Sequence, residues 1–208
     1  MKVKICGITD ADTAKHAIKQ GADALGFVFA ESKRKVTLEK AKEIIDALPP
    51  HILKVGVFVN EDVETIRRIV EYAGLSVVQL HGDEDPEMCK AFTVPVIKAL
   101  SIATRADLDK MKEYHRDYVL LDSPKGKYRG GNGVKFDWSL LSDFQTNGKK
   151  VILAGGLNED NVEEAIGVAK PYMVDVSSGV ETEGKKDLFK INRFIAKVKS
   201  ARLKEEVQ

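Results

Sequence analysis

The sequence has little of what disulfide-rich, metal-binding or membrane-spanning proteins need. Its 208 residues include only two cysteines, Cys6 and Cys89, which are too few for a disulfide framework and lack metal-ligand spacing. No apolar run approaches the length of a membrane span, and no signal peptide is recognisable. We therefore expect a cytoplasmic protein with reduced thiols and no metal site.

The chain also lacks an excess of charge of either sign. Lys and Arg number 33 against 32 Asp and Glu, which gives a net charge of +1. This balance offers no global electrostatic attraction to nucleic acid or to a membrane surface, and we expect neither partner. The length suits one domain with a sizeable core, so we predict a single domain over residues 1–208.

What the sequence does contain is a series of short apolar runs rich in β-branched and aromatic residues. Most runs are continuous rather than alternating, which is typical of strands covered on both faces, as in a parallel sheet. The predicted strands are residues 2–5, 24–29, 54–59, 77–80, 96–100, 118–122, 151–154 and 173–176.

Helical segments lie between these strands. The predicted helices are residues 10–20, 37–48, 63–73, 158–169 and 187–204, with shorter connections at 85–92 and 138–145. Eight strand–helix units of this size predict a compact (β/α)₈ (TIM) barrel, with a doubly wound open sheet as the alternative. No GxGxxG follows the first strand, which argues against a dinucleotide cofactor.

In such a barrel the active site is built from the carboxyl ends of the strands and the loops after them. Gly155 and Gly156 follow the seventh predicted strand, and Ser177, Ser178 and Gly179 follow the eighth. Taken alone, either segment is explained as well by a tight turn as by an anion site. Together, at the two strands where barrels often bind phosphate, they favour a phosphorylated ligand.

Three further side chains stand at the predicted strand ends or in the loops after them. Asp122 is a candidate proton donor or acceptor, or a structural cap, and the basic, glycine-rich segment 123–133 after it is suited to closing over an anion. Arg34, in a basic run, is suited to binding a carboxylate, unless the run is only a solvated face. His81 is a secondary candidate for positioning or polarising a substrate.

These segments, taken in order, resemble phosphoribosylanthranilate isomerases of tryptophan biosynthesis. The resemblance runs from residue 4 to residue 181 and is carried by "KICGIT", "GADALGFVFAESKRKV", "VGVFVNE", "VQLHGDE", "LLDS", "GGNGVKFDW", "LAGGLNEDNV" and "VDVSSGVE". It implies a (β/α)₈ barrel without metal or organic cofactor, acting on a small phosphosugar as a monomer or a homodimer.

The resemblance also implies residue roles in an Amadori rearrangement. Cys6 corresponds to the general base, Asp122 to the general acid, Arg34 to the anthranilate-binding residue, and Asp175 to a residue close to the ribose hydroxyls. A thiol serves as a base if its pKa is lowered. We expect Gly7 and the first turn of the next helix to lower the pKa, and Gly7 to let substrate approach the sulfur.

Three alternatives stand beside this interpretation. The isomerase of histidine biosynthesis is similar in fold and chemistry, but that family uses two aspartates in its mechanism. A cysteine at the end of the first predicted strand, Cys6, argues against this alternative. Indole-3-glycerol phosphate synthase uses lysines at strand ends, and only Lys98, within a predicted strand, is comparable. A non-catalytic phosphosugar-binding protein has no need of Cys6 or Asp122.

Overall fold

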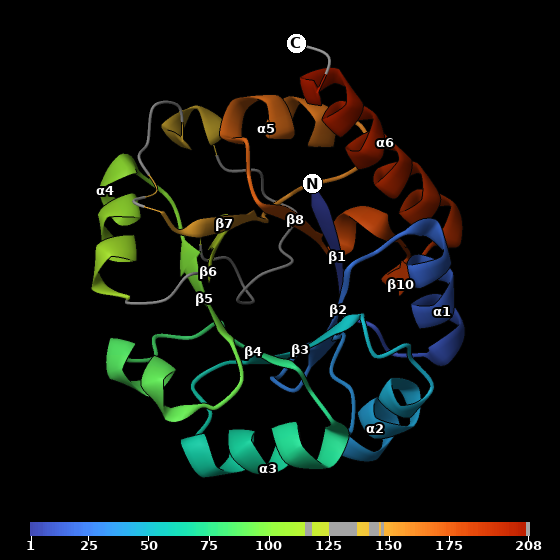
Figure 1. The fold of residues 1–208 in the computed structure, drawn as a ribbon, viewed down its shortest axis with the longest axis vertical. Coiled ribbons are helices and arrows are strands. Elements are labelled where there is room, and N and C mark those ends of the chain that lie inside the picture. Colours follow the sequence, from blue (N-terminus) through green and yellow to red (C-terminus); the bar gives the residue numbers. More distant parts are fainter. Residues whose placement is uncertain (115–117, 125–136, 142–145, 147, 207–208) are drawn as a thin grey trace.

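The structure, a computed structural model, describes residues 1–114, 118–124, 137–141, 146 and 148–206. Eight parallel strands close into a barrel in which each strand pairs with the next and β8 pairs with β1 (Figure 1). The strands are β1 (Lys2–Cys6), β2 (Ala24–Val28), β3 (Leu53–Phe58), β4 (Val77–Leu80), β5 (Val96–Ser101), β6 (Tyr118–Asp122), β7 (Lys150–Leu153) and β8 (Met173–Val176). The predicted barrel is confirmed, with every strand end within one residue of its expected place, and the open-sheet alternative is wrong.

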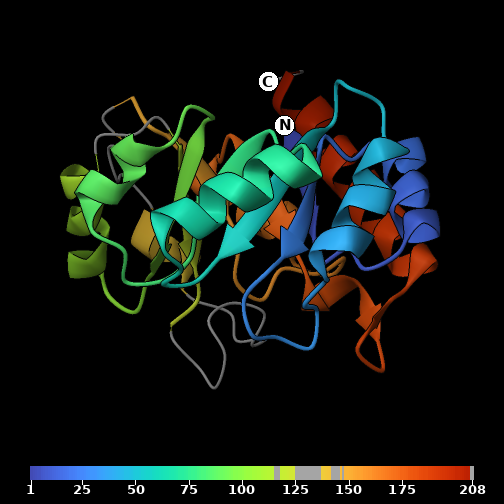
Figure 2. The ribbon, with the colours of Figure 1, turned by 90° about the horizontal axis from the view of Figure 1, so that it is seen from below.

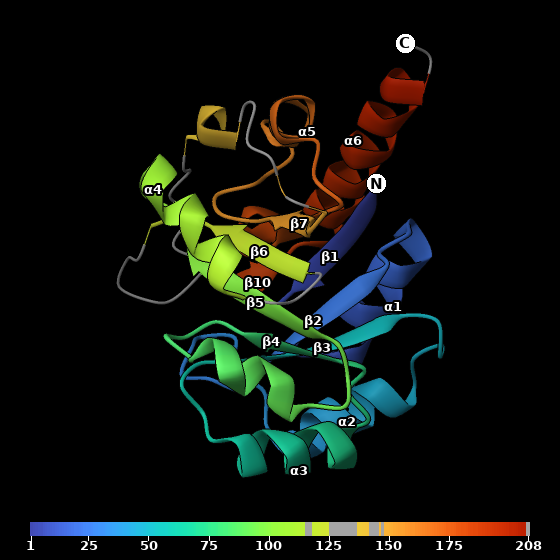
Figure 3. The same cartoon turned by 60° about the vertical axis from the view of Figure 1, so that its left-hand side comes forward.

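Helices and short 3₁₀ segments form a ring around the barrel (Figures 1 and 3). They are α1 (Ala11–Gln20), α2 (Leu38–Asp46), α3 (Val63–Ala73), η1 (Pro86–Ala91), α4 (Arg105–Leu108), η2 (Asp109–Glu113), η3 (Trp138–Leu141), α5 (Val162–Ala169), η4 (Ser178–Val180) and α6 (Leu188–Glu206). A small hairpin, β9 (Glu181–Thr182) and β10 (Lys185–Lys186), follows β8. None of the helices in the described ranges is long and apolar enough to cross a bilayer.

Side chains at the helix ends explain where most helices begin and end. The Asp10 carboxylate caps α1 by accepting a hydrogen bond from the Thr13 N–H at 2.7 Å, and α1 ends at Gly21, whose φ is 107°. The Thr37 hydroxyl caps α2 in the same way, accepting from the Lys40 N–H at 3.2 Å. These end residues account for the observed bounds of α1 and for the start of α2 at Leu38.

The helix predicted at 158–169 begins four residues late, at Val162. Asn158 donates its backbone N–H to the Asn161 side-chain oxygen at 2.9 Å, and the Asn161 amide nitrogen donates to the Gly156 carbonyl at 2.9 Å. Residues 158–161 therefore form a turn that holds the glycine loop after β7, where the sequence suggested the first turn of a helix.

Alternate residues along each strand face the interior of the barrel and its outer wall. The outward set packs against the helices in a large apolar core. The inward set includes a second apolar cluster, made of Ala24, Val55, Val77, Ile97, Ala99, Leu120, Ile152, Ala154 and Met173. Lys4, Gln79, Asp122 and Asp175, which belong to the inward set, are buried polar residues. The interior is thus apolar in one part and charged in another.

Both chain ends lie on one side of the barrel, and the β9–β10 hairpin lies on the opposite side (Figure 2). On the hairpin side the loops after β7 and β8 approach each other very closely. A Cβ on Gly179 would lie 1.8 Å from the Leu157 carbonyl oxygen, a distance that no side chain tolerates. Gly179 therefore allows these two loops to pack together.

We predict that Gly179→Ala lowers the free energy of unfolding by about 1–3 kcal/mol, because the added methyl forces the two loops apart. Gly167→Ala is the matched control, since nothing lies within 4 Å of a Cβ at this position in α5. The control is expected to raise stability by about 0.5–1 kcal/mol. Urea denaturation measures both variants, and equal effects would contradict the packing argument.

Candidate active site

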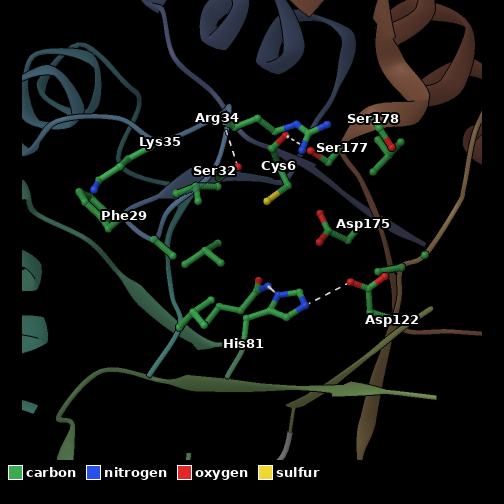
Figure 4. A pocket seen from close by; sticks show the side chains of 18 of the residues that line it. Cys6, Phe29, Ser32, Arg34, Lys35, His81, Asp122, Asp175, Ser177 and Ser178 are labelled. Atoms are coloured by element: carbon green, nitrogen blue, oxygen red, sulfur yellow. Dashed lines mark hydrogen bonds and ion pairs between the residues drawn. The ribbon is translucent and has the colours of Figure 1, made fainter. Parts of the chain in front are cut away.

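A cavity of about 450 Å³ opens at the carboxyl ends of the strands. It brings together nearly all of the residues expected at the site from the sequence (Figure 4). Those that line it are Cys6, Arg34, His81, Asp122, Gly155, Gly156, Asp175, Ser177 and Ser178. Gly179 is not among the lining residues; it packs against Leu157 behind the loop.

Cys6 ends β1 and points its sulfur into this cavity (Figure 4). Its neighbour in the sheet is Gly26, where a Cβ would lie only 2.7 Å from the Cys6 sulfur. Burial raises the pKa of the Cys6 thiol, although the ammonium groups of Lys4 and Lys186 act in the opposite direction. The expected lowering of this pKa is therefore wrong, and α1 begins only at Ala11.

Gly7 makes a close approach that the sequence did not indicate. Its φ is 82°, and a Cβ at this position would lie 2.5 Å from Cδ of Arg34. The space beside the Gly7 backbone is thus filled by the Arg34 side chain, which runs past the end of β1. The absence of a side chain at Gly7 therefore leaves room for Arg34 beside the end of β1.

Asp122 ends β6, where Ser123 and His81 hold its carboxylate. Its Oδ1 accepts a hydrogen bond from the Ser123 N–H at 2.8 Å, and its Oδ2 lies 3.1 Å from Nε2 of His81. The Gln79 amide nitrogen lies 3.0 Å from Nδ1 of His81. Since that nitrogen can only donate, Nδ1 accepts and Nε2 carries the proton that is donated to Asp122. His81, a secondary candidate in the sequence, is thus the direct partner of the proposed acid.

Asp175 and Lys4 form an ion pair inside the barrel. The Lys4 ammonium donates to Asp175 Oδ2 at 2.9 Å, and Lys4 is fully buried. Although burial by itself lowers the pKa of Lys4, Asp175 and the sulfur of Cys6 hold it above its ordinary value. The second oxygen of Asp175, Oδ1, is buried without a hydrogen-bond partner in the described part of the chain, so this acceptor is left unused beside the cavity. Sequence reasoning missed Lys4.

Arg34 is held at the cavity by a carboxylate that the sequence did not indicate. Its Nε and Nη2 donate to the two oxygens of Glu181 at 2.7 and 2.8 Å, and Glu181 also accepts from Lys186 at 2.6 Å. The hydrogen bond with Glu181 raises the pKa of Arg34. Two of the five guanidinium N–H donors are used in this way, which leaves donors for a ligand carboxylate.

The two loops expected to bind phosphate are anchored to the strands that carry Cys6 and Asp122. Gly155 and Gly156 have φ values of 79° and 68°, and a Cβ on Gly155 would lie 2.4 Å from the Ser123 nitrogen. On the other side, the Ser177 hydroxyl donates to the Cys6 carbonyl at 3.1 Å. Backbone amides next to the reacting groups are thus held in fixed positions.

The expectation for the basic loop after β6 lies mostly outside the described residues. The segment 123–133 falls mostly on residues 125–136, which lie outside the described residues. Within the described ranges, no group of three or more His, Cys, Asp or Glu side chains is arranged to hold a metal ion.

The fold and the cavity define the class of protein: a (β/α)₈-barrel enzyme with a thiol, a carboxylate and an arginine at the carboxyl ends of its strands. A family model described as N-(5'phosphoribosyl)anthranilate (PRA) isomerase matches residues 3–197. N-(5'-phosphoribosyl)anthranilate isomerase of Bacillus mycoides (strain KBAB4) is 60% identical over 200 residues, which cover 96% of this chain and 98% of the relative.

Solved structures agree with the sequence comparisons. Phosphoribosyl anthranilate isomerase from Thermotoga maritima matches with a TM-score of 0.89 and 43% identity, over 96% of this chain and 99% of that one. A second isomerase structure, in complex with reduced 1-(o-carboxyphenylamino)-1-deoxyribulose 5-phosphate, matches with a TM-score of 0.86 and 42% identity over the same shares. The chain belongs to the N-(5'-phosphoribosyl)anthranilate isomerase family. This membership decides against the three alternatives weighed above.

The contacts of Glu181 predict a pH-dependent contribution to stability. Burial alone raises the pKa of Glu181, but the hydrogen bond from Arg34 and the charge of Lys186 bring it below its ordinary value of 4.5. A carboxyl with a lowered pKa stabilises the fold above its ordinary pKa, and that contribution is lost as the pH falls through the lowered value.

We therefore expect Glu181→Gln to lower the free energy of unfolding by about 1.5–3 kcal/mol at neutral pH. The difference in the free energy of unfolding between this variant and wild type should shrink below pH 4.5, as Glu181 of the wild type becomes protonated and loses its charge. Urea denaturation at several pH values measures it. Glu43→Gln, which removes an exposed pair with Lys40, is the control and should cost less than about 1 kcal/mol. A pH-independent difference for Glu181 would contradict the prediction.

Proposed function

We propose that Cys6 is the general base and Asp122 the general acid in the isomerisation of N-(5-phosphoribosyl)anthranilate that this chain catalyses as a member of its family. The reaction is an Amadori rearrangement to 1-(2-carboxyphenylamino)-1-deoxyribulose 5-phosphate in tryptophan biosynthesis. The observation that carries the proposal is that a thiol from β1 and a carboxylate from β6 face one cavity, with Arg34 and the two small-residue loops around them.

Ring opening is the step for the acid. A proton is delivered to the furanose oxygen, the C1′–O bond breaks, and the nitrogen lone pair forms a protonated Schiff base. The Asp122 carboxyl carries the proton on Oδ2 and passes it to the ring oxygen, which leaves a carboxylate. His81 keeps its own Nε2 proton; its hydrogen bond to Oδ2 orients the carboxyl and stabilises the carboxylate that forms.

Removal of the C2′ proton is the step for the base. The iminium acidifies this C–H bond, whose electron pair forms the C1′=C2′ bond while the C=N pair returns to nitrogen. The enolamine then tautomerises to the ketone. Cys6 takes the proton as a thiolate, and its position at the end of β1 supports this role.

The remaining lining residues supply binding. Phosphate is held by the loops of Gly155 and Gly156 and of Ser177 and Ser178, which Gly179 keeps closely packed. A ribose hydroxyl donates to Oδ1 of Asp175, the buried oxygen without a described partner. The donors of Arg34 that Glu181 leaves free bind the anthranilate carboxylate. The complex of a related isomerase with a reduced carboxyphenylamino-deoxyribulose phosphate supports a ligand with these three groups.

The position of Lys98 argues against an indole-3-glycerol phosphate synthase. Its side chain leaves the outer wall of the barrel, where its ammonium donates to Glu84 at 2.6 Å and to the Gly82 carbonyl at 2.8 Å. It does not line the cavity, as the lysine of an indole-3-glycerol phosphate synthase would have to. A cytoplasmic location and a monomeric or homodimeric state stay predictions.

The activity itself is tested with freshly made phosphoribosylanthranilate. Adding the protein is expected to accelerate the loss of anthranilate fluorescence well beyond its spontaneous decay. No acceleration would overturn the function, whatever the roles of individual residues.

We predict that Cys6→Ala and Asp122→Asn each lower kcat by about 10²–10⁴-fold, the usual contribution of a general base or acid. Each substitution removes a proton-transferring group and leaves the binding loops in place. Steady-state kinetics from the same fluorescence signal measure the loss. Full activity of Cys6→Ala would leave the function standing and overturn this mechanism.

Arg34→Ala should mainly raise KM, by about 10–100-fold, because a charged hydrogen bond to the substrate carboxylate contributes roughly 1.5–3 kcal/mol. Lys33→Ala is the control: Lys33 is the exposed neighbour in the same basic run and does not line the cavity. A similar rise in KM for both variants would show that general charge, and not a fixed guanidinium, attracts the substrate.

A further inference from the structure

Lys4 is a fully buried cation directly beneath the proposed base. It precedes Cys6 by two residues on β1, so both side chains point to the inside of the barrel. The register of the sheet pairs Lys4 with Asp175 across β8, and their ion pair measures 2.9 Å. Cys6 and Asp175 line the cavity, whereas Lys4 lies behind them.

A charge in this position needs a reason, because removing an ammonium and a carboxylate from water costs several kcal/mol per ion. Apolar side chains fill much of the barrel interior. A further apolar pair at Lys4 and Asp175 would serve folding at least as well. The ion pair therefore points to a role in the chemistry of the cavity.

Among the described residues, the charged groups that act on the Cys6 sulfur come from four places in the fold. They are Lys4 on β1, Arg34 after β2, Asp175 on β8 and Lys186 on β10. Arg34 and Lys186 are both bound to Glu181, which offsets their charge. Lys4 has a carboxylate partner, Asp175, at 2.9 Å, and the charges of Lys4 and the Cys6 sulfur also act on each other.

We propose that Lys4 is a positioning residue whose buried ammonium stabilises the Cys6 thiolate, and that Asp175 and the sulfur compete for this ammonium. The inference rests on Cys6 being the base. When a substrate hydroxyl donates to Oδ1 of Asp175, the carboxylate charge is shared, and the ammonium is released toward the sulfur. Substrate binding thereby prepares the base.

The test is the pH dependence of Cys6 alkylation by iodoacetamide in a Cys89→Ala background, where Cys6 is the only thiol. The midpoint of the rate against pH reports ionisation of the Cys6 thiol in the free protein. Lys4→Met should move this midpoint upward by about 1–3 pH units, as expected for loss of a close opposite charge. It should also lower kcat much more than it raises KM.

Lys98→Met is the matched control. Lys98 is an equally buried strand lysine with a carboxylate partner, Glu84, at 2.6 Å, but it faces the outer wall. Its loss should leave the alkylation midpoint where it is in the parent. An unchanged midpoint in Lys4→Met, or an equal shift in both variants, would overturn the proposal.

Asp175→Asn keeps the proposal testable if Lys4→Met does not fold. Without the competing carboxylate the ammonium is left to the sulfur, so the midpoint should move downward, opposite to Lys4→Met. An unchanged or raised midpoint would overturn the proposal. These titrations need no turnover, so they fail independently of the base assignment, which the activity of Cys6→Ala decides.

Discussion

The site depends on the pairing of β8 with β1, which closes the barrel. In this pairing Lys4 lies opposite Asp175, which brings the ion pair together, and the Ser177 hydroxyl reaches the Cys6 carbonyl. Because side chains alternate along a strand, a slip of one residue would turn Lys4, Cys6 and the residues around them out of the barrel. Closure of the sheet therefore also sets the position of the proposed base relative to the loop that follows β8.

Around this closure, each reactive group has a partner from another strand or loop. Asp122 is held by His81 from the end of β4, and Arg34 is held by Glu181 from the β9–β10 hairpin. These contacts orient the side chains as well as balancing their charges, since the bidentate Arg34–Glu181 pair sets the plane of the guanidinium. A cavity of about 450 Å³ thus presents donors and acceptors whose orientation is set before a ligand arrives.

Local patterns predicted the strands, most helix ends and the residues at strand ends, because each depends on neighbours in sequence. Which residues pair with each other depends on contacts across the whole chain; these pairings, and the residues Lys4 and Glu181, were missed. Glu181 lies 147 residues from Arg34, and Asp175 lies 171 residues from Lys4. Residues two apart on a strand share a face, so the position of Lys4 relative to Cys6 follows from β1 alone, but no pattern in the sequence indicates what Lys4 meets there. The direction of the Cys6 pKa shift also required burial, which a sequence does not give.

A raised thiol pKa is compatible with a basic role for Cys6, and the structure suggests why. The strength of a base grows with its pKa, so a thiolate formed in a buried site is a stronger base than an exposed one. The difficulty is to form it, because burial disfavours the charge. Lys4 supplies the positive charge that stabilises such a thiolate. It is already inside the barrel, and its partner Asp175 has one oxygen left for a substrate hydroxyl. The same burial that raises the pKa strengthens the attraction between Lys4 and the sulfur, so the thiolate is favoured where the substrate lies.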